Sequence, residues 1–194
     1  MLEPLGPACS FCAEPLPEQN PLICGACCMQ RPCVDRVLTS YRFTEPLRTL
    51  IHAFKYESAL YLSSLLIELM WAAKDPGYTT DCLIPVPLHQ KRLQERGFNQ
   101  AAILAVKLGQ KLQKPYELYS CDKILATLPQ AGLSAKERKT NLKHAFQARP
   151  VPYQHVTLVD DLFTTGSTAN EVAKTLKQQG VQRVDVWCCA RACW

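Results

Sequence analysis

The sequence predicts an α/β fold, in which a twisted, mainly parallel sheet is flanked by helices and preceded by a small cysteine-rich module. Two observations support this prediction. Short apolar runs typical of buried strands alternate with segments whose apolar residues recur at offsets of three and four, as in helices. In addition, six of the eleven cysteines lie within the first 33 residues. We therefore expect a metal-binding module over 1–36 and an α/β domain over 37–194.

The N-terminal module contains two C-x-x-C pairs, formed by Cys9, Cys12, Cys24 and Cys27. Two such pairs can bring four thiolates around one ion, and a segment of about 35 residues is too short to close a core without such a crosslink. We expect structural Zn²⁺; reduced surface thiols, an iron–sulfur cluster or a redox pair are the alternatives. Cys28 could replace Cys27, and Cys33 is a reserve ligand that we leave unassigned. Phe11 is expected on an exposed turn, where it could contact nucleic acid.

A strand over 37–43 and two helices are expected next. Pro46 suits the first turn of the first helix. Lys55 falls at the break between the two helices, where it either contacts a phosphate or remains a solvated cation at a helix C-terminus. The apolar stripes that predict the two helices are formed by Leu47, Leu50, Ile51 and Phe54, and by Leu62, Leu65, Leu66, Leu69 and Met70.

A buried strand over 82–86 ends at prolines and leads into a basic turn over 88–97, which contains Lys91, Arg92 and Arg96. In open α/β sheets, ligands bind beyond the carboxyl ends of the strands. These three cations are therefore candidates for a pyrophosphate, whose charge needs several donors. The alternative is a solvated basic helix start. A helix to residue 112 and a strand over 118–125 would complete a β-α-β unit.

Residues 127–141 are polar and basic, which predicts a flap that closes over a ligand. Arg138 and Asn141 are the candidate contacts of this flap. Ser134 and Glu137 have the spacing of a capping box, so a surface helix is the alternative, and both descriptions can hold together.

Residues 156–168 are the most informative segment, because an apolar strand, two acids and a turn rich in hydroxyl groups follow without a gap. Asp160 and Asp161 are expected where the strand ends. A helical stripe begins at residue 169, so a helix N-terminus with unpaired N–H groups would suit a phosphate, while the acids accept hydrogen bonds from sugar hydroxyls. Ribose 5-phosphate satisfies both ends; an ordinary strand with helix-capping residues is the alternative. The phosphate-binding turn is expected to comprise Thr164, Thr165, Gly166, Ser167 and Thr168.

The composition is typical of a soluble globular protein, with 47% hydrophobic and 20% charged residues. No apolar run approaches the roughly 20 residues that a transmembrane helix needs. The first residues lack the basic start and apolar stretch of a secretory signal, so we expect a cytoplasmic protein. The net charge of +5 is compatible with anionic partners.

The segment Val-Thr-Leu-Val-Asp-Asp-Leu-Phe-Thr-Thr-Gly-Ser-Thr over 156–168 resembles the signature of the type I phosphoribosyltransferases for 5-phosphoribosyl 1-pyrophosphate (PRPP). Thr157 and Phe163 depart mildly from that signature. The resemblance implies that Asp160 and Asp161 hold the ribose hydroxyls and that residues 164–168 hold the 5′-phosphate. It also implies that the loop after the strand at 82–86 holds the pyrophosphate and that a flexible loop closes over PRPP.

Nearly the whole chain resembles the ComF family. The resemblance rests on the C-x-x-C pairs, Phe-Lys-Tyr at 54–56, Ile-Pro-Val-Pro at 84–87, Arg-Gly-Phe-Asn-Gln at 96–100, the Lys-Glu-Arg…Asn loop and the PRPP signature. That family is associated with natural competence, the uptake of single-stranded DNA. The resemblance therefore implies single-stranded DNA and the DNA-uptake machinery as partners.

Two functions remain open at this point. In the first, the protein transfers phosphoribosyl from PRPP to an acceptor that the sequence does not identify; Mg²⁺ accompanies PRPP, and Asp160, Asp161 and Arg138 are the catalytic residues. In the second, a non-catalytic DNA-binding accessory uses PRPP as a regulatory ligand. A base-salvage enzyme would need a nucleobase pocket, which the sequence does not reveal. In the first function, Lys55, Lys91, Arg92 and Arg96 join the turn at 164–168 in binding PRPP.

Overall fold

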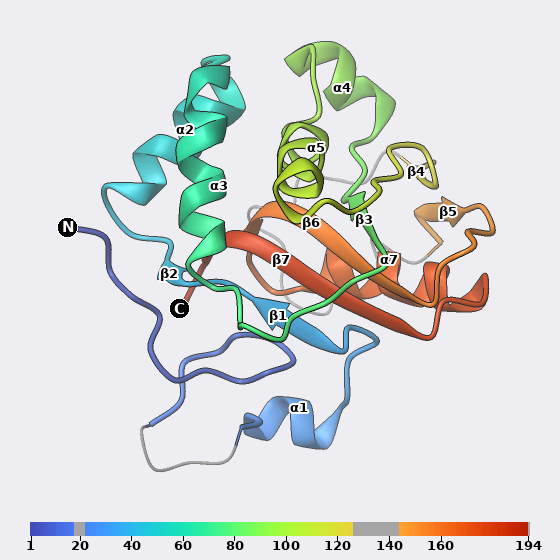
Figure 1. The fold of residues 1–194 in the computed structure, drawn as a ribbon, viewed down its shortest axis with the longest axis horizontal. Helices are drawn as coiled ribbons and strands as arrows, with labels where there is room; N and C mark the ends of the chain where they lie inside the picture. Colours follow the sequence, from blue (N-terminus) through green and yellow to red (C-terminus); the bar gives the residue numbers. More distant parts are fainter. Residues whose placement is uncertain (18–21, 126–143, 194) are drawn as a thin grey trace.

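A parallel sheet forms the centre of the computed structural model, which describes residues 1–17, 22–125 and 144–193 (Figure 1). The strand order is β1-β7-β6-β3, and β2 pairs with the far end of β7. Every pairing in this sheet is parallel, which confirms the predicted mainly parallel sheet. The strands are β1 (Arg36–Leu38), β2 (Tyr41–Arg42), β3 (Cys82–Pro85), β6 (His155–Phe163) and β7 (Arg183–Arg191).

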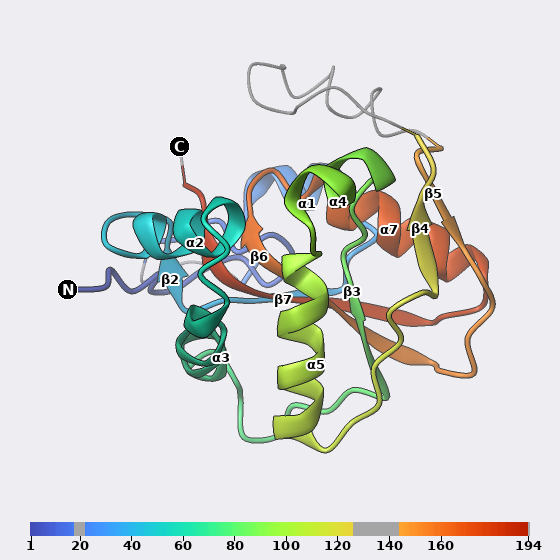
Figure 2. The same cartoon turned by 90° about the horizontal axis from the view of Figure 1, so that it is seen from above.

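Helices cover both faces of the sheet (Figures 1 and 2). Three of them pack on one face: α2 (Leu47–Tyr56), α3 (Ser63–Trp71) and α5 (Gln100–Leu112). The opposite face is covered by α7 (Ser167–Gln178) and by part of the N-terminal segment. Because both faces are buried, the central strands are rich in apolar residues, and eight of the nine residues of β7 are buried. The other helices among the described residues are α1 (Gly25–Met29), the short 3₁₀ helix η1 (Leu60–Leu62) and α4 (Gln90–Arg96).

The segment expected as one strand over 37–43 forms two short strands instead. β1 and β2 both pair with β7, and residues 39–40 interrupt them. At this edge of the sheet, two short strands therefore pair with different parts of the long strand β7.

The predicted strand over 118–125 was wrong in its place and extent. Only Cys121–Lys123 forms a strand, β4, and it pairs antiparallel with β5 (Phe146–Ala148) in a separate two-stranded sheet. The chain after α5 touches the main sheet through Tyr116, next to Leu83 of β3. The predicted β-α-β unit is thus reduced to a single bridge, after which the chain leaves to form the β4–β5 hairpin stem.

The expected flap over 127–141 lies outside the described residues, since 126–143 are not described. Arg138, Asn141 and the capping pair of Ser134 and Glu137 therefore remain predictions from the sequence. Within the described parts of the chain, we find no helix with the length and apolar character needed to cross a bilayer.

Candidate ligand pocket and cysteine cluster

A pocket of about 840 Å³ opens at the carboxyl ends of β3 and β6. Its volume lies in the range usual for small-molecule sites, and its place is the one where open α/β sheets bind ligands. The wall combines charges of both signs, which suits a ligand with anionic and hydroxyl groups. The charged side chains that line the pocket are Lys55, Arg92, Arg96, Lys123, Glu95, Asp160 and Asp161.

The two acids lie inside β6, not at its end as expected. The strand continues because Leu162 and Phe163 pair with Ala190 and Arg191 of β7. Asp161 is almost completely buried, with 1% of its surface exposed, whereas Asp160 is half-buried. The pair therefore forms part of the pocket floor within a fixed backbone.

Asp161 is held by two neighbouring helices. The ammonium nitrogen of Lys55 lies 2.5 Å from Oδ2 of Asp161, as an ion pair without the alignment of a hydrogen bond. The side-chain amide of Gln100, in the first turn of α5, donates to Oδ1 over 3.3 Å. Lys55 belongs to the last turn of α2, not to the break between helices that we expected, because α2 continues to Tyr56. The charge of Lys55 is therefore directed at Asp161.

The surroundings shift the pKa values of Asp160 and Asp161 in opposite directions. Burial opposes the ionisation of Asp161, but the adjacent Lys55 ammonium and hydrogen bonds with Asp160 and Gln100 together outweigh it and lower the pKa of this carboxyl below its ordinary value. Burial, reinforced by the charge of Asp161, raises the pKa of Asp160 well above its ordinary value. The coupled pair therefore favours a single negative charge, held on Asp161.

A turn with a left-handed residue connects β6 to α7. Gly166 is the N-cap residue of α7 and has φ 73° and ψ 0°. A Cβ atom at this position would lie 2.5 Å from Cζ of Phe163, so both the backbone conformation and the close approach of the ring require glycine. Asn170 donates the first helical hydrogen bond to the carbonyl of Gly166 over 2.8 Å. The turn thus presents a helix N-terminus to the pocket, as an anion site needs.

Only part of the expected turn faces the pocket. Thr164, Gly166 and Thr168 line it. Thr165 and Ser167 lie outside the pocket lining and hydrogen-bond each other through their hydroxyls over 2.9 Å. This hydrogen bond stabilises the conformation of the turn, and the turn places Thr164, Gly166 and Thr168 in the pocket wall.

The basic segment after β3 forms a helix, α4, in place of the expected turn. His89 caps this helix by accepting a hydrogen bond from the backbone N–H of Lys91 over 3.2 Å, and Gly97 ends it at φ 82°. Arg92 and Arg96 line the pocket, whereas Lys91 is exposed and lies outside the lining. Two of the three predicted cations therefore reach the pocket.

The sequence analysis did not assign three residues that line the pocket. Gln100 connects Arg96 to Asp161, since it accepts from Arg96 and donates to Asp161; it belongs to the Arg-Gly-Phe-Asn-Gln motif, which was the available signal. Tyr56 lies under the Arg96 guanidinium, 5.0 Å from the ring centroid. Lys123 comes from β4, where burial and the charge of Arg92 lower its pKa to about 8. Its strand was expected in the main sheet, so no signal placed it here.

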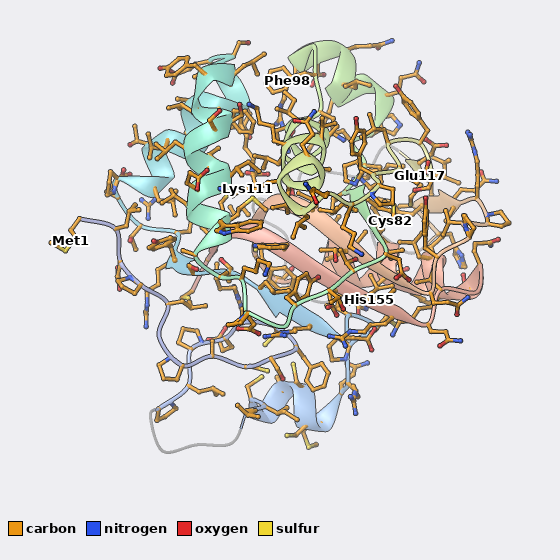
Figure 3. The ribbon with its side chains drawn as sticks, viewed as in Figure 1. Met1, Cys82, Phe98, Lys111, Glu117 and His155 are labelled. Carbon is orange, nitrogen blue, oxygen red and sulfur yellow. The ribbon has the colours of Figure 1, made fainter. Side chains whose placement is uncertain are left out.

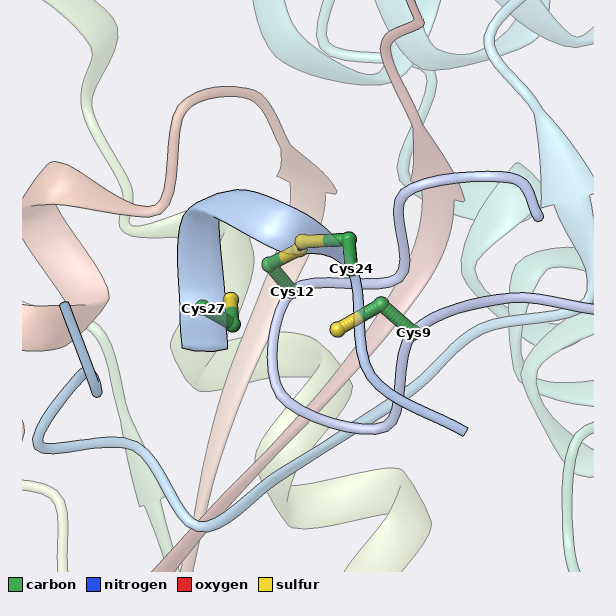
Figure 4. A group of neighbouring side chains, drawn as sticks. All are labelled: Cys9, Cys12, Cys24 and Cys27. Atoms are coloured by element: carbon green, nitrogen blue, oxygen red, sulfur yellow. The ribbon is translucent and has the colours of Figure 1, made fainter. Parts of the chain in front are cut away.

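The four cysteines of the C-x-x-C pairs gather in one cluster (Figure 4). All four sulfur atoms lie within 4.8 Å of one another, and those of Cys12 and Cys24 are 3.6 Å apart. A tetrahedral ion with metal–sulfur bonds of about 2.3 Å would separate its sulfurs by about 3.8 Å, so the cluster fits one metal ion. Cys27 is on the buried side of α1, and Cys28 is exposed, which leaves Cys27 as the fourth member of the cluster.

Burial raises the pKa of Cys12 to about 12, and it raises the pKa of Cys27 as well. At Cys9 burial also opposes ionisation, but backbone hydrogen bonds from Cys24, Phe11 and Cys12 together outweigh it and lower the pKa to about 7. Because a bound cation would reverse this penalty by stabilising the deprotonated sulfurs, the donor set is suited to a metal. Phe11 packs in the same cluster and is 7% exposed, with the Arg31 guanidinium 4.5 Å from its ring centroid. The expectation that Phe11 is exposed was therefore wrong.

Thr157, one departure from the signature, is satisfied inside the protein. Its hydroxyl lies 2.6 Å from the hydroxyl of Tyr78 and 2.8 Å from that of Thr80. These contacts lie at the amino end of β6, near His155 in Figure 3, and the acid pair lies farther along the same strand. The polar residue in the apolar run therefore anchors the sheet and does not alter the pocket.

The chain is similar to several curated proteins, although no family model matches it. It is 37% identical over 196 residues to Competence protein F of Haemophilus influenzae, which covers 96% of this chain and 85% of that protein. It is 36% identical to DNA utilization protein YhgH of Escherichia coli K12, over 94% of this chain and 83% of that protein. Competence protein ComFC of Bacillus subtilis is 32% identical over 50% of this chain and 39% of its own length.

One solved structure shows a weaker likeness. It is a purine phosphoribosyltransferase from Pyrococcus horikoshii Ot3, with a TM-score of 0.33 and 20% sequence identity, over 68% of this chain and 69% of that chain. A likeness of this degree carries no argument about the pocket.

Proposed function

The chain belongs to the competence protein F family, and we propose that it binds PRPP in the pocket between β3 and β6 and acts in the use of DNA. The observation that carries the proposal is that Asp160, Asp161 and the Gly166 turn share one pocket with Arg92 and Arg96. Such a pocket combines hydroxyl acceptors, an anion site and cations, which are the three groups that PRPP requires.

The proposed orientation of PRPP follows from the order of these groups. The 5′-phosphate would lie at the α7 N-terminus, over Gly166, and the ribose hydroxyls would donate to Asp161, which Lys55 keeps ionised. The pyrophosphate would face Arg92 and Arg96. Lys123 borders the same pocket and adds a further cation on the hairpin side.

Phosphoribosyl transfer is the chemistry that this orientation would serve. The acceptor nucleophile would form a bond to C1 of the ribose while the bond from C1 to the pyrophosphate oxygen breaks, and pyrophosphate would leave with the bonding electrons. Mg²⁺ bound with PRPP would supply additional positive charge for the leaving group. Arg92 and Arg96 would stabilise that developing charge, and Arg138, outside the described residues, is the proposed contribution of the flap.

Zinc is the proposed ion of the cysteine cluster. Four sulfur donors in a compact arrangement favour Zn²⁺ in a structural site, and a protein with reduced thiols fits the cytoplasm. Cys9, Cys12, Cys24 and Cys27 would then crosslink the first C-x-x-C loop to the start of α1.

Single-stranded DNA is a second candidate ligand, because seven relatives carry the words competence or DNA utilization in their names and match most of this chain. Lys91 and Arg92 on the exposed side of α4 would contact its phosphates. If they do, the affinity of an oligonucleotide should fall steeply between about 50 and 200 mM salt. A shallow salt dependence would argue against DNA binding through these cations.

Calorimetric titration of PRPP with Mg²⁺ tests the main proposal. We expect the wild-type protein to bind, and Asp160→Asn with Asp161→Asn to weaken binding by at least about a hundredfold, because about two hydrogen bonds to the acid pair are lost, including those to the ionised Asp161. Asp75→Asn, an exposed acid paired with Arg36, is the matched control and should bind as the wild type does. Equal affinity of the double variant, or no binding by folded, zinc-loaded wild type, would overturn the proposal.

A further inference from the structure

Arg191, the last residue of β7, joins the cysteine cluster to the pocket. Its side chain is buried, with 6% of its surface exposed. The Nε atom donates to the backbone carbonyl of Cys12 over 2.9 Å, and Nη2 donates to the carboxylate of Glu14 over 2.8 Å. A buried guanidinium needs such partners, because an unpaired charge would be costly. These two partners come from the first C-x-x-C loop, and the third nitrogen, Nη1, donates to the carbonyl of the adjacent Ala192.

That loop is a closed unit whose shape depends on the cluster. The backbone N–H of Cys9 donates to the carbonyl of Glu14 over 2.8 Å, and Ala13 donates to the carbonyl of Cys9 over 2.7 Å. The loop packs on a small apolar cluster that contains the cysteines and, through Ala13, on the main core. An ion bound by Cys9 and Cys12 would therefore fix the carbonyl and the carboxylate that hold Arg191.

The other side of Arg191 faces the turn between β6 and α7. Its guanidinium lies 5.7 Å from the ring centroid of Phe163. The backbone of Phe163 accepts a hydrogen bond from Ala192 over 2.9 Å, so the ring is fixed beside the end of β7. The same ring fills the space beneath Gly166. Phe163, a departure from the signature, thus separates the guanidinium from the turn.

A second contact links the module to the same turn. The backbone N–H of Cys33 donates to Oδ1 of Asn170 over 2.5 Å. Asn170 lies in the first turn of α7, and its own N–H donates to Gly166. The cysteine-rich segment therefore touches the turn through Arg191 and Phe163 on one side and through Asn170 on the other.

We propose that Arg191 is a positioning residue, through which metal binding at the cysteine cluster sets the phosphate affinity of the turn at 164–168. The metal-loaded loop fixes the Arg191 guanidinium through two hydrogen bonds. The guanidinium packs against the ring of Phe163, and that ring packs against Gly166. The inference rests on the proposed phosphate site. Linkage requires reciprocity: a phosphate ligand must strengthen metal binding by the factor by which the metal strengthens ligand binding. A coupling of about 5- to 150-fold is the usual range.

Hydrogen exchange tests the positioning role without any ligand. In the zinc-loaded protein, Arg191→Gln should accelerate amide exchange over residues 163–170 by at least about fivefold, while zinc stays bound. Arg191→Lys keeps the charge but loses the planar guanidinium with its several donors. Its amide exchange over residues 163–170 should therefore be faster than in the wild type and slower than in Arg191→Gln. Arg183→Gln, at the opposite end of the same strand and paired with Asp185, is the matched control. Unchanged exchange over 163–170 in folded Arg191→Gln would overturn the inference.

Zinc release tests the linkage itself. The zinc affinity of the wild type is measured by transfer of zinc to a chromogenic chelator, with and without ribose 5-phosphate. We expect ribose 5-phosphate to raise the apparent zinc affinity by at least about fivefold. In Arg191→Gln this difference should disappear. If ribose 5-phosphate binds the wild type but leaves zinc affinity unchanged, the coupling is refuted while the phosphate site stands. If it does not bind, the proposed phosphate site and the linkage built on it both fail.

Discussion

The ion pair between Lys55 and Asp161 makes a strong prediction about stability. Lys55→Met keeps a side chain of similar length and removes the charge. Asp161 is 1% exposed and would keep the Gln100 amide, 3.3 Å away, as its remaining side-chain partner among the described residues. Removing one member of a buried ion pair costs about 3–5 kcal/mol. Because the Lys55 side chain is 18% exposed, we expect the lower end, about 3 kcal/mol.

The expected loss depends on pH with a defined sign. In the wild type the pKa of Asp161 is lowered, so its contribution to stability is present above the unfolded value of about 3.9 and is lost as pH falls through the folded value. Without Lys55, burial would raise the pKa of Asp161, and stability would be lost as pH rises through that raised value. The destabilisation by Lys55→Met should therefore be larger at pH 8 than at pH 5.

Thermal and urea unfolding measure both effects. For a chain of this size, about 3 kcal/mol corresponds to a melting temperature lower by roughly 6–12 °C. Lys55→Met combined with Asp161→Asn should recover most of the loss, since no buried charge remains unpaired. Lys114→Met, an exposed lysine beyond the end of α5, should change little. A loss below about 0.5 kcal/mol, or one that is equal at pH 5 and pH 8, would refute the reasoning.

Two further predictions concern the turn and the cysteine cluster. Gly166→Ala forces a Cβ into the left-handed region and against Phe163, so affinity for ribose 5-phosphate should fall by at least about tenfold, measured by calorimetry; Gly77→Ala, which meets no atom within 4 Å, should leave it unchanged. Cys27→Ser should lose bound zinc in metal analysis, whereas Cys28→Ser should retain one equivalent, because only the Cys27 sulfur belongs to the cluster. Equal zinc content in the two variants would contradict this choice of ligand.

Local patterns predicted the parts of the fold whose environment is simple. The buried strands at 82–85 and 155–163 are rich in apolar residues because both faces of the sheet are covered. The helix after Gly166 was predicted from its apolar stripe and its hydroxyl-rich start. The C-x-x-C spacing likewise identified the four clustered sulfurs, since short loops restrict which thiols can meet.

The errors concern features that depend on distant partners. Asp160 and Asp161 lie inside β6 because the last residues of that strand pair with β7. The residues of β6 alone do not indicate this pairing. β4 pairs with β5, whose three residues are too short to predict as a strand. Lys55 was expected at a break between helices, but it lies in the last turn of α2, paired with Asp161 far along the chain. Pairings between remote segments are therefore what the sequence analysis could not supply.

A crystal structure with PRPP and Mg²⁺ would test the central claim most directly. We expect the 5′-phosphate over the N-terminus of α7 at Gly166 and the ribose hydroxyls within hydrogen-bond distance of Asp160 and Asp161, with the pyrophosphate facing Arg92. Ligand density elsewhere on the protein, or an unchanged pocket at saturating PRPP, would contradict the account.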